Sequence, residues 1–136
     1  MTDWDPARAA HLRVLRTDVG TVPVLSAEGE LDSWTSCWPV WSSAVAEACA
    51  DTGAGSEVFV LDLQRLYFMD LVGLASIEQL ASALKAGGRR LVLAGVRPRI
   101  REFLRHASAG ISAGCLSLEE ALAAAVAPST PPAAAA

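Results

Sequence analysis

Histidine and cysteine, the residues that build most metal and redox sites, are scarce in this sequence. The two histidines, His11 and His106, lie far apart with no thiol or clustered carboxylate beside them, so a zinc site is not expected. The three cysteines are odd in number and have no C-x-x-C spacing, which favours buried free thiols in a reducing compartment. They are Cys37, Cys49 and Cys115.

Long apolar runs and an excess of basic charge are also missing. No segment approaches the ~20 apolar residues that a membrane-spanning helix requires, and the acidic start, Met1–Asp5, does not resemble a signal peptide. These absences predict a cytoplasmic protein without direct membrane insertion. The formal net charge of −4 argues against nucleic acid as a partner, because phosphate binding requires a basic surface.

Basic side chains are few, but six arginines gather in one stretch of the second half. Such a run is usually the solvated surface of a strand end and a helix. The alternative is a surface that steers an acidic partner. The six are Arg89, Arg90, Arg97, Arg99, Arg101 and Arg105.

The composition that remains suits one folded domain. The 136 residues are 52% hydrophobic and 19% charged, which is sufficient for one buried core. We expect a single domain over residues 11–126, preceded by a flexible N-terminus, residues 1–10. The proline- and alanine-rich residues 127–136 have the composition of a disordered tail.

The first third of the chain has the pattern of a β-hairpin followed by a helix. Alternation places Leu12 and Val14 on one face of a strand, and Val22–Ala27 forms a second strand after a short connection. Proline cannot donate to a sheet ladder, so Pro23 is expected at a strand start or at an edge. The helix that follows is predicted to begin at Pro39, after a separate short turn.

Three tryptophans lie at helical spacing in this segment. Such a stripe is usually core, but three indoles exceed what one helix of a small domain commonly buries, and tryptophan is enriched in binding surfaces. We therefore expect two to be buried and one to contribute to a partner surface. Ser33, beside Asp32, is interpreted as the cap of the helical turn. The tryptophans are Trp34, Trp38 and Trp41.

Buried strands alternate with helices in the rest of the chain. This alternation predicts an α/β fold: a mostly parallel sheet of about five strands, an antiparallel N-terminal strand, and helices packed mainly on one side. The predicted strands cover residues 57–63, 90–94 and 111–116. One helix is predicted after Asp70, a second from Pro98 to His106, and a third over residues 118–126. A capping box at Ser117 precedes the third helix.

No motif of catalysis or cofactor binding is present. Residues 53–55 begin like a dinucleotide fingerprint, but Val58 takes the place of the third glycine, and a strand follows instead of a helix. Neither a P-loop nor a G-x-S-x-G elbow occurs. Asp32, Asp62 and Asp70 are interpreted as structural residues at strand ends and helix caps. We expect no enzyme activity, no cofactor and no metal.

Two segments carry a family resemblance. Residues 29–32 read GELD after the second strand, and residues 58–73 read VFVLDLQRLYFMDLVG. Together they resemble the STAS family, the domain of bacterial anti-sigma factor antagonists and of sulfate transporter tails, whose loop has the form F-M/I-D-S-S/T-G-L. The order of the later strand and helices also fits, so the resemblance covers roughly residues 11–126.

The resemblance implies a protein-binding regulator similar to an anti-sigma factor antagonist. Such a protein controls sigma-factor-dependent transcription by binding an anti-sigma factor that is also a serine kinase. In this family, phosphorylation of the hydroxyl residue directly after the loop aspartate releases the complex. A phosphate there adds about −1.5 to −2 charges to a contact surface at a helix N-terminus.

This sequence departs from the family pattern at the phosphorylated position. Leu71 stands there, and neither Leu71 nor Val72 can accept a phosphoryl group. We expect Asp70 to cap the helix and Gly73 to permit close approach. Leu71 and Val72 form either a permanently active apolar contact or the packing beneath a neighbouring loop of a silent domain. The expected partner-binding residues are Asp32, Ser33, Asp70, Leu71, Val72 and Gly73.

The sequence is compatible with other functions and assemblies. The chain can be a separate STAS subunit of an ABC-type membrane transporter, docked on its ATPase by the same loops. A phospho-receiver domain has a similar size, but it needs an acid pair after the first strand and a late lysine. Here the only lysine is Lys85, within a predicted helix. A homodimer is a further option.

Overall fold

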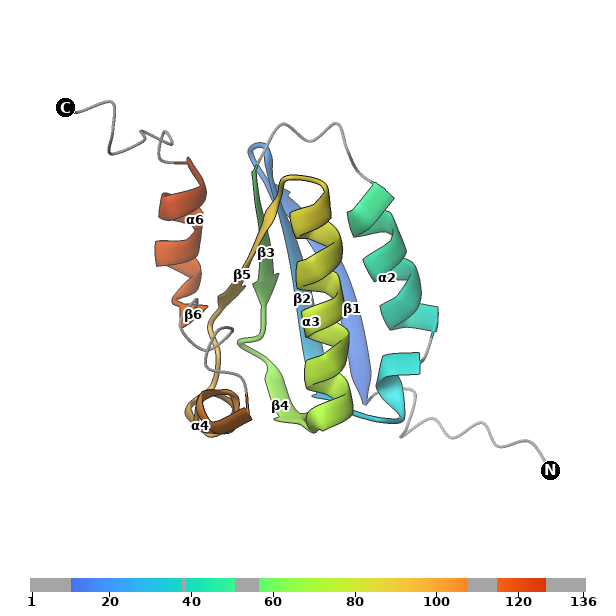
Figure 1. Cartoon of the computed structure of the whole chain (residues 1–136). Coiled ribbons are helices and arrows are strands. Elements are labelled where there is room, and N and C mark those ends of the chain that lie inside the picture. Colours follow the sequence, from blue (N-terminus) through green and yellow to red (C-terminus); the bar gives the residue numbers. More distant parts are fainter. Residues whose placement is uncertain (1–10, 38, 51–56, 108–114, 127–136) are drawn as a thin grey trace.

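The computed structural model describes residues 11–37, 39–50, 57–107 and 115–126, and within them it forms one mixed α/β sheet with flanking helices (Figure 1). The sheet has six strands in the order β1-β2-β3-β5-β6, with β4 beside β2. The elements are β1 (Leu12–Val19), β2 (Val22–Leu31), η1 (Thr35–Cys37), α2 (Pro39–Ala50), β3 (Val58–Asp62), β4 (Leu66–Met69), α3 (Leu71–Ala86), β5 (Arg90–Ala94), α4 (Pro98–Ala107), β6 (Cys115–Leu116) and α6 (Leu118–Val126).

The predicted hairpin and parallel sheet are confirmed. β1 and β2 pair antiparallel from Val19↔Val22 to Leu12↔Gly29, whereas the other strand pairs are parallel. Pro23 is the second residue of β2, and the pairing of β2 with β3 starts one residue later, at Val24. The missing N–H of the proline therefore costs no bond to β3.

Strand β4 was not predicted from the sequence. It extends the sheet beyond β3, because the first part of β2 pairs with β3 and the last part, Gly29–Leu31, pairs with β4. The register shifts between them: Gly29 pairs with Leu66 and Glu30 with Phe68, which leaves Tyr67 as an extra residue. This bulge changes the direction of neighbouring side chains on β4.

Helices α2 and α3 lie on one face of the sheet, and α6 lies on the other (Figure 1). The larger core, under α2 and α3, includes the fully buried Phe59, Leu61 and Ile77. α4 lies at the end of the sheet and contributes Ile100 and Leu104 to this core. The smaller core lies against α6 and consists of Val22, Val24, Val58, Val60, Val92, Ala94 and Ala121.

The helix boundaries agree with the sequence signals. Pro39 is the first residue of α2, and the separate short turn before it is η1. Ser117 and Glu120 form the predicted capping box of α6 through reciprocal bonds of 3.1 and 3.0 Å. Trp41 is buried and Trp34 is exposed. Cys49 is exposed, so the expectation of a buried thiol is wrong at this position. Trp38, the N-terminal residues 1–10 and the tail 127–136 lie outside the described residues.

Candidate functional site

The two motif segments meet at the end of the sheet where β2 and β4 finish. Leu31 and Met69 are paired as the last residues of these parallel strands. The residues that follow them, Asp32 and Asp70, therefore leave the sheet side by side. The N–H of Asp70 also donates to the carbonyl of Leu31 across 3.4 Å, which holds the start of α3 against the end of β2.

One carboxylate joins the two motifs. Oδ1 of Asp70 accepts the N–H of Gly73 at 2.8 Å, so Asp70 is the predicted N-cap of α3. Oδ2 of the same side chain accepts the N–H of Ser33 at 3.0 Å. Asp70 thus positions its own helix and the loop after β2 at once. The sequence predicted the first role and not the second.

Gly73 allows the first turn of α3 to press directly against β2. A Cβ atom at this position would lie 2.0 Å from the carbonyl oxygen of Leu31, far inside contact distance with backbone that cannot rotate away. Gly73 is buried at this contact. The prediction that this glycine permits close approach is confirmed, and the approach is between α3 and β2 of the same chain.

The loop after β2 is held by Asp32. Its Oδ1 accepts the N–H groups of Trp34 at 2.9 Å and of Thr35 at 3.0 Å, the donors at the start of η1. The buried hydroxyl of Thr35 donates to the carbonyl of Glu30 at 2.8 Å. Asp32 therefore caps this turn, whereas the neighbouring Ser33 was expected in that role from the sequence. Asp32 is suited to the role because the N–H groups two and three positions on turn back toward its carboxylate.

Leu71 and Val72 begin α3 with their side chains in solvent. They are 67% and 48% exposed, so the alternative in which they pack beneath a neighbouring loop is wrong. Leucine and valine stabilise no helix N-terminus by capping, and exposed apolar residues that lie together are typical of contact surfaces.

Two aromatic side chains on β4 extend this exposed region. Tyr67 is 60% and Phe68 is 48% exposed, although neighbours on a strand normally face opposite sides. The bulge at Tyr67 accounts for this exception. Neither residue was expected at a surface, because a strand of four residues with a bulge shows no regular alternation. We call the exposed apolar residues of this end of the sheet the end surface: Trp34, Tyr67, Phe68, Leu71 and Val72.

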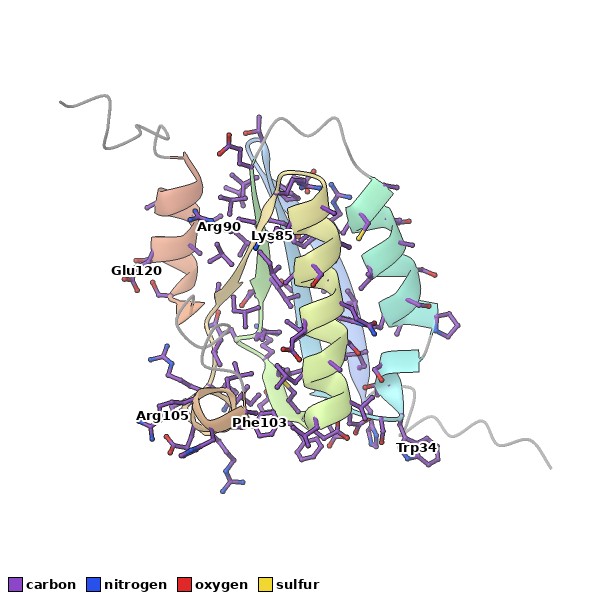
Figure 2. The ribbon with its side chains drawn as sticks, in the orientation of Figure 1. Trp34, Lys85, Arg90, Phe103, Arg105 and Glu120 are labelled. Atoms are coloured by element: carbon purple, nitrogen blue, oxygen red, sulfur yellow. The ribbon has the colours of Figure 1, made fainter. Side chains whose placement is uncertain are left out.

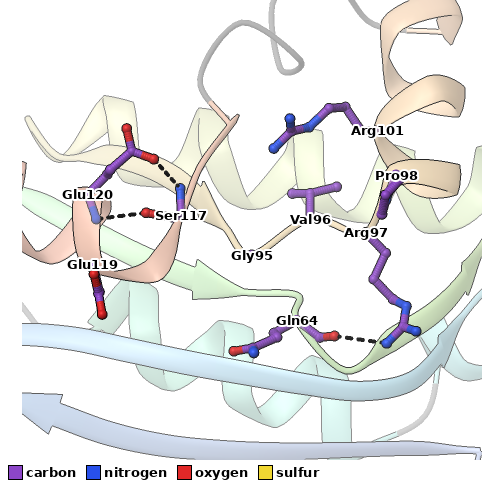
Figure 3. Close-up of a pocket in the computed structure, with 9 residues that line it drawn as sticks. All are labelled: Gln64, Gly95, Val96, Arg97, Pro98, Arg101, Ser117, Glu119 and Glu120. Carbon is purple, nitrogen blue, oxygen red and sulfur yellow. Dashed lines mark hydrogen bonds between the residues drawn. The ribbon is translucent and has the colours of Figure 1, made fainter.

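A pocket of about 670 Å³ lies apart from these loops, between the segment that leads into α4 and the start of α6 (Figure 3). It is lined by arginines and glutamates together, and the oxygens of the Ser117–Glu120 capping box are already bonded to each other's backbone. None of the predicted partner-binding residues lines it. Over the described ranges, no cluster of three potential metal ligands occurs, and no helix has the length and apolar character needed to cross a bilayer.

Comparisons with known proteins agree with this geometry. An anti-sigma factor antagonist from Mycobacterium paratuberculosis has a similar structure: TM-score 0.62, 27% identity, and coverage of 84% of this chain and 93% of that one. The phosphorylated form of the Bacillus cell fate determinant SpoIIAA has a TM-score of 0.53 at 21% identity, covering 83% and 97%. The STAS domain of a SulP transporter from Vibrio cholerae has a TM-score of 0.57 at 19% identity, covering 81% and 84%.

The last two structures share only the fold, since their identities are low. No curated protein sequence matches the chain. The sequence model of the STAS domain, in contrast, matches residues 14–121, which include both motifs, the sheet from Val14 within β1 to β6, and the start of α6. The chain therefore belongs to the STAS domain family.

Proposed function

We propose that this protein is a regulator resembling an anti-sigma factor antagonist. It binds a kinase-type anti-sigma factor through the end surface and the loops held by Asp32 and Asp70. Its binding controls sigma-factor-dependent transcription, and it is not switched off by phosphorylation after the loop aspartate. The 27% identity to an anti-sigma factor antagonist over most of both chains supports this assignment.

The exposure of Leu71 carries the proposal. This side chain is 67% exposed at the first position of α3, directly after the capping aspartate. Solvating an apolar side chain has no stabilising effect on the free protein, whereas burying it fully against a partner is worth about 1.5–3 kcal/mol. The rigid contacts of Asp70 and Gly73 preorganise this position, so little conformational entropy is lost on binding.

The same residue removes the family's switch. Release depends on adding a phosphate to a hydroxyl, and a leucine side chain has no acceptor atom for it. In this protein the complex is accordingly controlled by the amounts of the two partners, or by a modification elsewhere.

Binding of purified kinase-type anti-sigma factors from the same cell, measured by calorimetry, tests the proposal. Val72→Asp introduces a charge into the end surface, and we expect a loss of affinity of about tenfold or more. An acidic residue in the first turn favours a helix, so this variant should keep its fold. The matched control is Val19→Asp: Val19 is 43% exposed against 48% for Val72, but it lies at the hairpin turn at the other end of β1 and β2.

The control must bind like the wild type. If the wild type binds none of the anti-sigma factors, the antagonist role is wrong. Co-purification with the ATPase of a membrane transporter would then favour the alternative of a transporter STAS subunit.

A further inference from the structure

Helix α4 differs in charge from the rest of the protein. Residues 97–107 contain four of the eleven basic side chains and one of the fifteen acidic ones. The other residues hold seven basic and fourteen acidic side chains, so a segment of net charge +3 is attached to a remainder of net charge −7. A local excess of this size produces a positive potential on an acidic protein.

These charges are exposed and only partly neutralised. Glu102 is the acidic residue of α4, and both Arg105 and His106 bond its Oε1. The hydrogen bond from Arg105, followed by that from His106, lowers the pKa of Glu102, which keeps it ionised for this pairing. Arg99 and Arg101 form no ion pair within the described part of the chain. Arg101 acts at longer range on Glu120, where its charge helps to lower the pKa of that carboxyl. Figure 2 shows α4 end-on, with Arg105 directed away from the sheet.

Arg97 connects this charge to the end surface. Its guanidinium lies over the ring of Tyr67, 4.4 Å from the centroid, and donates to the carbonyl of Gln64 at 3.3 Å. Figure 3 shows this bond reaching across from the start of α4. Because Tyr67 belongs to the end surface, the basic residues border the apolar ones directly. Arginine and aromatic residues in this combination are enriched in protein interfaces.

We propose that the α4 basic surface, made of Arg97, Arg99, Arg101 and Arg105, binds an acidic segment of the same protein partner that contacts the end surface. This inference rests on the proposed function and adds the charge of the partner. The arginines attract the partner over distance and raise the rate of association, whereas the apolar contacts slow its dissociation.

The amount and the location of the positive charge favour a protein over nucleic acid as the ligand of the α4 basic surface. Proteins that bind duplex DNA commonly neutralise about 6–10 phosphates, and their basic residues spread over a broad face. Here one helix of ten residues and the arginine before it carry the excess, and the remainder of the chain repels phosphate. An acidic protein segment needs only a few such charges.

Stopped-flow association of the full chain with the anti-sigma factor found by calorimetry tests the inference. The variant is Arg99→Glu with Arg101→Glu, and the control is Lys85→Glu with Arg90→Glu. Both pairs change the net charge from −4 to −8, and all four side chains are exposed. Lys85 and Arg90 are labelled in Figure 2 near the opposite end of β5 from α4.

At low ionic strength, about 20 mM salt, we expect the α4 variant to associate about tenfold more slowly and the control to stay within about twofold of the wild type. The difference should shrink toward unity near 0.5 M salt, where screening lengths fall to a few ångströms. If the anti-sigma factor binds and the two variants have equal association rates, the inference is wrong and the proposed function stands.

If no anti-sigma factor binds, a glutamate homopolymer of about 20 residues serves as the acidic ligand, and its binding to the full chain tests the inference without a partner protein. Amide NMR shifts confined to residues 97–107, and lost in the α4 variant but not in the control, support a surface for acidic polypeptides. Shifts elsewhere, or shifts unchanged in the α4 variant, overturn it. A DNA duplex of equal charge that displaces the homopolymer completely would overturn the assignment to a protein.

Discussion

The backbone N–H of Ser33 donates to Oδ2 of Asp70 across 3.0 Å, although 37 positions separate the two residues in the sequence. This bond makes the loop after β2 and the start of α3 one unit. A partner that contacts either loop therefore meets a surface whose two halves are already fixed relative to each other.

Replacing Asp70 tests that unit. Asp70→Ala removes the acceptors of both Gly73 and Ser33, and we expect the free energy of unfolding to fall by about 1–3 kcal/mol. Asp70→Asn keeps one acceptor oxygen, so it should lose less. Urea denaturation measures both. Equal losses for the two variants would mean that only one of the two bonds contributes to stability.

Gly73 is expected to tolerate no side chain. Gly73→Ala places a Cβ 2.0 Å from the oxygen of Leu31, and α3 can only move away by breaking the Asp70 contacts. We expect a loss of at least about 3 kcal/mol or failure to fold. Gly87→Ala is the matched control, because its Cβ would lie 3.5 Å from the nearest heavy atom and its φ of −91° suits alanine. The control should change stability by less than about 1 kcal/mol.

Much of the fold was predictable because its signals are local. Alternation predicted the hairpin, Pro39 marked the first residue of α2, and the Ser117 capping box marked the start of α6 at the next residue. Strand β4 was missed because it has four residues and contains a bulge, so it shows no regular alternation. Within the site, helix capping by Asp70 is local and was predicted. Its bond to Ser33 depends on the pairing of β2 with β4, which no local pattern in the sequence indicates.

A single substitution should restore the missing switch. Leu71→Ser supplies a hydroxyl at the first position of α3, where the residue is 67% exposed and so within reach of a kinase. With ATP and a kinase-type anti-sigma factor, we expect this variant to gain one phosphoryl group by mass spectrometry and then to dissociate, because the added charge faces a contact surface. Leu71→Ala should bind without phosphorylation. Phosphate incorporated into the wild type would show that another residue is the acceptor.

Acid should loosen the start of α6 through Glu120. The N–H of Ser117, followed by its side chain, bonds the Glu120 carboxylate and lowers its pKa below the usual 4.5. A lowered pKa in the folded protein means that the carboxylate stabilises the folded state above pH 4.5, and that this contribution is lost as pH falls through the lowered value.

A carbon-detected NMR titration should therefore give Glu120 a midpoint below 4.5, together with loss of helical shifts in the first turn of α6 at the same pH. Ser117→Ala removes the second of the two contacts, so the midpoint should move part of the way back toward 4.5. An unchanged midpoint in that variant would show that the Ser117 side chain does not lower the pKa, since Ser117→Ala leaves the N–H and the charge of Arg101 in place.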